Sequence, residues 1–135
     1  MTPAGAGGTV PGVAKPEPIS VILTSVGTEQ QALEISEELV ARSLATCVNI
    51  VPCLRSIYRW KGKICTDSEY LLLIKTRRAL FGAVSDAIRE LHSYELPEVL
   101  EFPVGNAEPN FHSWVVSMAT GVPADAELDP EPSFD

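Results

Sequence analysis

The stretch that decides the fold is residues 54–75, LRSIYRWKGKICTDSEYLLLIK. All the basic residues of its first half fall on odd positions (Arg55, Arg59, Lys61 and Lys63), a period of two that is typical of a β-strand with two different faces. Gly62 follows between two lysines, where its tolerance of positive φ suits a tight hairpin turn. We therefore predict two antiparallel strands, residues 45–60 and 63–75, with a bulge or a sheet edge at Pro52, which lacks a backbone donor.

This hairpin is longer than the domain that carries it. A strand of about 13 residues spans roughly 43 Å, whereas a domain of about 100 residues is only about 30–35 Å across. The overhanging part carries four large apolar or aromatic side chains, Ile57, Tyr58, Trp60 and Ile64. Since a two-stranded ribbon of this composition is not stable alone in water, we predict that it packs on a neighbouring subunit. A strongly bent hairpin that packs on its own domain is the alternative.

Five further segments have the patterns of regular elements. Thr28 and Gln31 form the capping box of an amphipathic helix, and Thr76 is the expected N-cap of a second helix. The apolar positions of a last helix are Phe111, Trp114, Val115 and Met118. The expected ranges are a strand at 19–26, a helix at 28–44, a helix from 76, a strand at 99–104 and a helix beginning between 106 and 109.

The predicted order of elements is β-α-β-β-α-β followed by a helix. Because crossovers of this kind are right-handed, the order folds most simply into an antiparallel four-stranded sheet with both main helices on one face. The sequence thus predicts an α+β fold, a ferredoxin-like β-α-β-β-α-β sandwich with a long hairpin between the second and third strands and a C-terminal helix.

Charge divides the chain into three parts. The formal net charge is −8, and residues 121–135 hold five acidic residues and no basic one. We expect residues 1–18 and 121–135 to be flexible tails, the second of them acidic, and residues 19–120 to form one domain. The excess of acid argues against nucleic-acid binding, and no apolar run is long enough to cross a membrane.

The cysteines indicate a reducing compartment. There are three, Cys47, Cys53 and Cys65, without a C-x-x-C pair, which argues against a disulfide framework and against a zinc ribbon. The first residues do not have the pattern of a signal peptide. The cytoplasm is therefore the expected location.

The densest cluster of candidate functional residues is 92–98, HSYELPE. His92 could be a metal ligand or a general base, or a residue favoured only by the end of the preceding helix. Glu98 could be its partner carboxylate or a surface acid. Tyr94 is expected to be a packed ring with a bonded hydroxyl.

Other candidates are single residues with two interpretations each. Cys47 is either a small core residue or a soft ligand for copper or zinc. Cys53 and Cys65 lie on the two arms of the hairpin, as surface thiols or as a pair close enough to oxidise. Lys75 could hold an anion or be a charge at the end of a strand. His112 is expected to be exposed.

Nothing in the sequence predicts an enzyme. It contains no nucleophile elbow, P-loop, dinucleotide fingerprint, zinc-protease helix or EF-hand loop. The least favoured hypothesis is a catalyst that uses His92 and Glu98 as base and acid.

Several segments, taken in order, resemble the CutA family of divalent-cation tolerance proteins. They are ATCVNIVP (45–52), SIYRWKGKI (56–64), LIKT (73–76), HSYELPE (92–98) and Trp114. The resemblance covers residues 19–120 and implies a cytoplasmic homotrimer, joined through the long hairpins, that acts in tolerance of copper and other divalent metals. The implied trimer is similar to PII-type signalling proteins, so small-ligand sensing or a protein-interaction scaffold is the alternative function.

The resemblance also assigns residues to clefts between subunits. The expected metal ligands are His92 and Cys47. The copper ligands proposed in some members are a first-strand Cys and two adjacent His, where this chain has Thr24, Leu91 and His92. The sequence further departs from common family residues at Ser93 and Phe111. Residues expected to bind a ligand in the clefts are Asn49, Tyr58, Trp60, Lys75, Tyr94, Glu98 and Trp114.

Overall fold

A computed structural model describes residues 16–124. The predicted tails, residues 1–18 and 121–135, therefore lie mostly outside the described part of the chain. The elements are β1 (Ile19–Val26), α1 (Glu29–Ala41), β2 (Cys47–Trp60), β3 (Lys63–Arg77), the 3₁₀ turn η1 (Arg78–Leu80), α2 (Phe81–Leu91), β4 (Leu100–Pro103) and α3 (Pro109–Met118).

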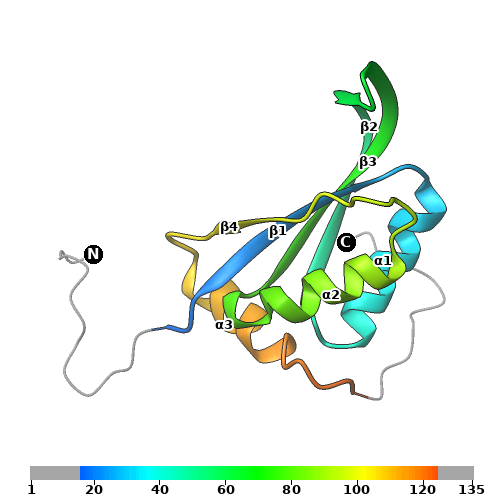
Figure 1. The fold of residues 1–135 in the computed structure, drawn as a ribbon. Helices are drawn as coiled ribbons and strands as arrows, with labels where there is room; N and C mark the ends of the chain where they lie inside the picture. Colours follow the sequence, from blue (N-terminus) through cyan, green and yellow to red (C-terminus); the bar gives the residue numbers. More distant parts are fainter. Residues whose placement is uncertain (1–15, 125–135) are drawn as a thin grey trace.

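The four strands form one antiparallel sheet in the order β2-β3-β1-β4. Helices α1 and α2 lie side by side on one face of it, and α3 packs at the end where β1 begins and β3 ends (Figure 1). This arrangement confirms the predicted α+β fold with its four-stranded antiparallel sheet.

The core lies between the sheet and helices α1 and α2. Alternate residues of β1 and β3 point into it because successive side chains of a strand lie on opposite faces. Its largest fully buried side chains include Ile22, Ile35, Leu39, Leu72, Ile74 and Ile88. On β4, Leu100 and Phe102 are 48% and 51% exposed, so this edge of the sheet has an apolar surface without a cover in the described part of the chain.

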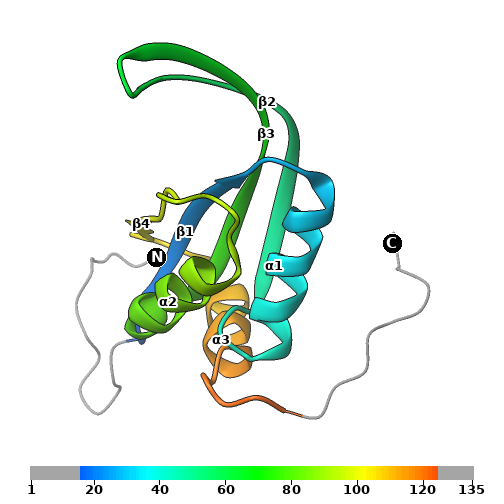
Figure 2. The same ribbon diagram turned by 45° about the vertical axis from the view of Figure 1, so that its right-hand side comes forward.

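Beyond the sheet, β2 and β3 continue as a curved two-stranded ribbon (Figure 2). The ribbon contains the predicted bulge, since the register shifts between Val51 and Leu54 and Cys53 has a φ of 66°. Its turn has positive φ at both Lys61 (51°) and Gly62 (78°), the combination that a two-residue hairpin turn requires.

The apolar side chains of this ribbon stay exposed within one chain. Ile57 is 72% and Ile64 is 74% exposed. They lie on one face, because Ile57 pairs with Thr66 and Ile64 pairs with Arg59. The overhang expected from strand length is therefore present, and one chain does not bury it.

Of the two predicted helix caps, one is absent and the other is confirmed in part. Thr76 does not cap a helix; it continues β3 opposite Ser20, fully buried, and its hydroxyl donates to the Leu44 carbonyl at 2.6 Å. Thr28 does cap α1, accepting from the Gln31 backbone N–H at 3.1 Å. The reciprocal half of the capping box is missing, because the Gln31 side chain donates to the Leu91 carbonyl at the end of α2 and accepts from the backbone N–H and hydroxyl of Ser93.

Helix α3 is less buried than its apolar stripe predicts. Val115 is its only buried residue, whereas Phe111, Trp114 and Met118 are 39%, 43% and 52% exposed. The reason is position, since the helix touches the end of the sheet and not its centre. His112, expected to be exposed, is half-buried, and its Nε2 lies 2.5 Å from the Glu17 carbonyl.

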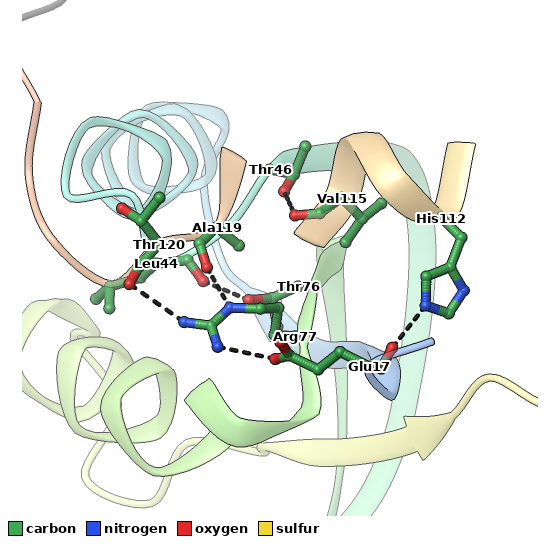
Figure 3. Close-up of polar contacts among 9 residues, drawn as sticks. All are labelled: Glu17, Leu44, Thr46, Thr76, Arg77, His112, Val115, Ala119 and Thr120. Atoms are coloured by element: carbon green, nitrogen blue, oxygen red, sulfur yellow. Dashed lines mark hydrogen bonds and ion pairs between the residues drawn. The ribbon is translucent and has the colours of Figure 1, made fainter. Parts of the chain in front are cut away.

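Arg77 joins both ends of the described chain to the sheet (Figure 3). Its guanidinium forms an ion pair with Glu17 at 2.8 Å and donates to the carbonyls of Ala119 at 2.5 Å and Thr120 at 3.1 Å. Nearby, the Thr46 hydroxyl donates to the Val115 carbonyl at 2.6 Å. Arg77 thus fixes the end of α3 and the segment that precedes β1.

Candidate functional site

A pocket of about 730 Å³ lies between the β2–β3 hairpin and the loop that follows α2. This volume is within the range of small-molecule sites, about 300–1,000 Å³. Its lining is Ser25 of β1, residues 56–60 of β2, Asp67 and Glu69 of β3, and Tyr94, Glu95, Leu96 and Glu98 of the loop. We call it the hairpin pocket.

Two tyrosine–carboxylate pairs organise the hairpin pocket. The Tyr94 hydroxyl donates to Oε2 of Glu69 at 2.6 Å, and the Tyr58 hydroxyl donates to Asp67. The hydrogen bond to Asp67 raises the pKa of Tyr58 to about 12. Burial, and then the hydrogen bond to Glu69, raises the pKa of Tyr94. Both phenols therefore remain protonated donors across the physiological range.

A glycine leaves the space for one of these rings. A Cβ on Gly27, which directly follows β1, would lie 3.1 Å from the Tyr94 hydroxyl. A side chain at this position would therefore crowd the ring that holds Glu69.

His92 positions this loop and is not free to act elsewhere. It is 8% exposed. Its Nε2 lies 2.7 Å from the Ser25 carbonyl, and its Nδ1 accepts from the Tyr94 backbone N–H at 3.0 Å. Because a carbonyl only accepts, Nε2 carries the proton. The imidazole also packs on the Tyr94 ring with centroids 4.5 Å apart, so His92 fixes the aromatic wall of the pocket.

The two predicted metal ligands do not meet within one chain. His92 contacts Ser25, which pairs with Leu71 of β3, whereas Cys47 pairs with Lys75. Four residues along a strand amount to roughly 13 Å. In the described part of the chain, no group of three or more His, Cys, Asp or Glu side chains is placed to hold a metal ion.

Five of the remaining predicted site residues line one of two pockets. Tyr58, Trp60, Tyr94 and Glu98 line the hairpin pocket. Lys75 lines a second pocket of about 240 Å³ near α3, with its Nζ 5.5 Å from the Phe111 ring centroid.

Two other predicted site residues lie outside both pockets. Trp114 packs on Phe111 at 5.7 Å between ring centroids. Asn49 is exposed on β2 opposite Leu73.

The hairpin cysteines do not form a pair. The partner of Cys65 across the ribbon is Tyr58, while Cys53 occupies the bulge. Cys47, Cys53 and Cys65 are all free thiols. Of the two alternatives for Cys53 and Cys65, separate thiols or a facing pair, the structure has separate thiols. The sequence left the choice open because it does not give the register between the two strands of the hairpin.

Asp67 and Glu69 are pocket residues that sequence reasoning missed. Both follow the period of two on the third strand and therefore share a face with Cys65. The alternation was visible in the sequence, but only the register places Asp67 opposite Ser56 and Glu69 opposite Leu54.

Comparison with known proteins gives consistent matches. A family model described as CutA1 divalent ion tolerance protein matches residues 20–118. Protein CutA of Mus musculus is 39% identical over 120 residues, which are 89% of this chain and 65% of the mouse protein. The divalent-cation tolerance protein CutA of Thermus thermophilus is 40% identical over 95 residues, 70% of this chain and 92% of its own length.

Solved structures give the same result. The divalent cation tolerance protein (Cut A1) of Thermus thermophilus superposes with a TM-score of 0.72 at 38% identity, covering 74% of this chain and 97% of that one. CutA1 of Oryza sativa gives a TM-score of 0.73 at 34% identity, covering 74% and 92%. The chain thus spans nearly all of these two structures and about two thirds of the mouse relative.

Proposed function

Because this chain belongs to the CutA1 divalent ion tolerance family, we propose that it is a non-enzymatic homotrimer that acts in tolerance of divalent cations. The observation that carries the proposal is the overhanging hairpin, whose Ile57 and Ile64 are more than two thirds exposed in one chain. Burying two such side chains in a neighbour is favourable by about 25 cal/mol per Å² of apolar surface. The uncovered apolar side chains of β4 supply a second surface of the same kind.

The oligomeric state tests the assembly directly. Light scattering is expected to give three times the 14.6 kDa of one chain. Ile64→Asp places a charge in the proposed interface and is expected to yield smaller species. Its matched control is Leu33→Asp on α1, where the leucine is 46% exposed and outside that interface. A monomeric wild-type protein, or equal dissociation of both variants, would overturn the assembly.

The metal part of the proposal is copper or another divalent cation held in clefts between subunits. One chain alone does not bring Cys47 and His92 together, so a site that uses both needs a second subunit. In His92, moreover, Nδ1 accepts and Nε2 donates within its own chain. Binding of a metal by this imidazole therefore requires the loss of at least one of these hydrogen bonds.

Equilibrium dialysis separates these possibilities. The assembled protein is dialysed against copper or zinc, with Cys47→Ser and His92→Gln as variants and Cys53→Ser as the thiol control. Loss of bound metal in both variants, but not in the control, would support a site shared between subunits. If the unsubstituted protein and the three variants all retain the same amount of metal, the assignment of Cys47 and His92 as ligands is refuted.

The hairpin pocket favours a second candidate function, the sensing of a small ligand. A pocket of about 730 Å³ is far larger than a single ion needs, and its walls combine aromatic rings with carboxylates. Fold likeness to signalling proteins does not carry this candidate, since fold alone does not determine function. Thermal shift measurements with a panel of small charged molecules would test it.

A cytoplasmic location is also part of the proposal. Its support is the three free thiols, two of them on the hairpin. None of the helices in residues 16–124 has the length and apolarity that a membrane crossing requires. Fractionation of cells that express the full chain tests the location.

A further inference from the structure

The two faces of the β2–β3 ribbon differ in charge. Residues that pair directly across an antiparallel ribbon lie on the same face. One face, which we call the isoleucine face, therefore consists of Arg55, Ile57, Arg59, Ile64, Thr66 and Ser68. All six of these side chains are exposed, and none is acidic. The carboxylates of the ribbon, Asp67 and Glu69, lie on the other face. The isoleucine face thus combines apolar and positively charged side chains without a negative one.

Neither arginine of this face has a carboxylate partner in the described part of the chain. The arginines that form ion pairs there are Arg42, Arg77 and Arg89, not Arg55 or Arg59. Packing of the isoleucines on a neighbour brings both guanidinium groups against the surface of that neighbour. A surface that carries carboxylates is favoured there, because complementary charges meet across stable interfaces.

A second exposed surface combines apolar side chains with the opposite charge. It follows α2 and continues along β4, and this β4 strip consists of Glu95, Leu96, Glu98, Leu100 and Phe102, all exposed. Its apolar members are 71%, 48% and 51% exposed in chain order. No Lys or Arg follows Arg89 in the sequence, so the strip has no basic neighbour along the chain. Because β4 is also an edge strand of the sheet, an apolar surface on it calls for a cover.

These charges distinguish between two kinds of contact between copies of the chain. If the same surface of two copies met around a twofold axis, arginines would face arginines, or carboxylates would face carboxylates, and both arrangements are unfavourable. A contact between the isoleucine face of one copy and the β4 strip of another joins opposite charges and buries apolar side chains of both. Because its two surfaces differ, such a contact leaves one of each free and repeats until a ring closes.

Within one chain the two surfaces are not joined. Arg59 and Glu98 both line the hairpin pocket, and no ion pair connects the ribbon to the β4 strip in residues 16–124. We propose that the isoleucine face of each subunit packs on the β4 strip of the next, with Arg55 and Arg59 against Glu95 and Glu98. The proposal rests on the trimer of the proposed function and adds which surface of the neighbour the hairpin contacts.

Charge reversal followed by mixing tests this contact. One variant carries Arg55→Glu with Arg59→Glu, and the other carries Glu95→Lys with Glu98→Lys. Each variant alone is expected to dissociate at a protein concentration at least about tenfold above that of the unsubstituted protein, because like charges then meet at every contact. An equal mixture of the two variants joins opposite charges at all but one contact of a mixed trimer, so light scattering is expected to show the trimer again.

The matched control lies on α1. Glu34→Lys with Glu37→Lys changes the net charge as the β4-strip variant does, at residues that are exposed outside both surfaces. It is expected to change the dissociation concentration by less than about twofold. Circular dichroism reports whether each variant is folded. Where a reversal variant does not fold, the same residues are changed to Gln, and the two Gln pairs combined in one chain should weaken the trimer by less than the product of their separate effects.

Three results would overturn the inference while leaving the trimer in place. One is a trimer that both reversal variants retain with unchanged affinity. Another is failure of the mixture to assemble although both reversals combined in one chain restore assembly, which would place the contact within a chain. The last is equal dissociation of the α1 control and the β4-strip variant, which would indicate a diffuse effect of net charge. A monomeric unsubstituted protein is a different outcome, because it overturns the proposed assembly together with the inference.

Discussion

Two buried threonines offer a direct test of the hydrogen bonding in the core. Thr24 of β1 and Thr76 of β3 are both 0% exposed, and both point toward the helices. The Thr76 hydroxyl donates to the Leu44 carbonyl at 2.6 Å. The Thr24 hydroxyl is buried without a hydrogen-bond partner in the described part of the chain. Thr→Val replaces the hydroxyl by a methyl group of similar size at both positions.

The two substitutions should act in opposite directions. Thr76→Val leaves the Leu44 carbonyl without this donor, which destabilises the protein by about 1–3 kcal/mol. Thr24→Val removes a hydroxyl whose burial is uncompensated, so it should stabilise by about 1 kcal/mol or more. The higher β-propensity and hydrophobicity of Val contribute to both, and they therefore cancel in the difference. We expect the two free energies of unfolding to differ by about 2–4 kcal/mol.

Guanidinium unfolding, followed by far-UV circular dichroism at one fixed protein concentration, measures this difference. The concentration is held constant because the stability of an assembled protein depends on it. A change of about 1 kcal/mol also corresponds to about 4–8 °C in the melting temperature of a domain of about 60–100 residues. Equal shifts of both variants in one direction would show that side-chain volume or propensity, and not hydrogen bonding, governs these sites.

Three further predictions use the site and the ends of the chain. The pKa of Tyr94 is raised above its usual 10.0, so the contribution of this hydroxyl to stability is complete below about pH 10 and is lost as the pH rises further. Tyr94→Phe should therefore lower the free energy of unfolding at pH 7 and reduce its further loss at alkaline pH, as measured by urea unfolding at a series of pH values. Arg77→Lys replaces a fork that reaches three oxygens and should destabilise by about 2 kcal/mol, with faster proteolysis after α3; unchanged cleavage would contradict this role. Gly121→Ala should destabilise by about 1 kcal/mol, because φ is 80° and the new Cβ would lie 3.1 Å from Leu80, whereas Gly82→Ala in α2 meets open space and should stabilise by about 0.5–1 kcal/mol in thermal melts.

Local patterns predicted most of the secondary structure. The hairpin around Gly62 and the bulge near Pro52 could be predicted because strands and turns prefer particular residue types over a few neighbouring positions. The second helix is present, but its expected N-cap at Thr76 was wrong, because α2 begins only at Phe81. A threonine before an apolar stripe is a good N-cap, but continued pairing with β1 and the Leu44 carbonyl stabilise it in the strand. Such long-range contacts leave no local signal.

The candidate site shows the same division. Tyr58, Trp60, Tyr94 and Glu98 were selected from the sequence, and the structure places all four around one cavity. His92 was selected as a metal ligand or general base, but in the structure both of its ring nitrogens are already hydrogen-bonded within the chain. An imidazole looks the same in a sequence whether its nitrogens are free or bonded, so its role as a positioning residue needed coordinates.

The sequence by itself determined the order of the elements, the turn and bulge of the hairpin, its excess length, and the family to which the chain is similar. Each depends on residue type and spacing along the chain. Only the tertiary structure decided which carboxylates face the aromatic rings, why Arg77 is present, and that Cys47 and His92 lie apart. These facts depend on register across strands and on contacts between distant segments, and a one-residue change of register would move every side chain to the other face.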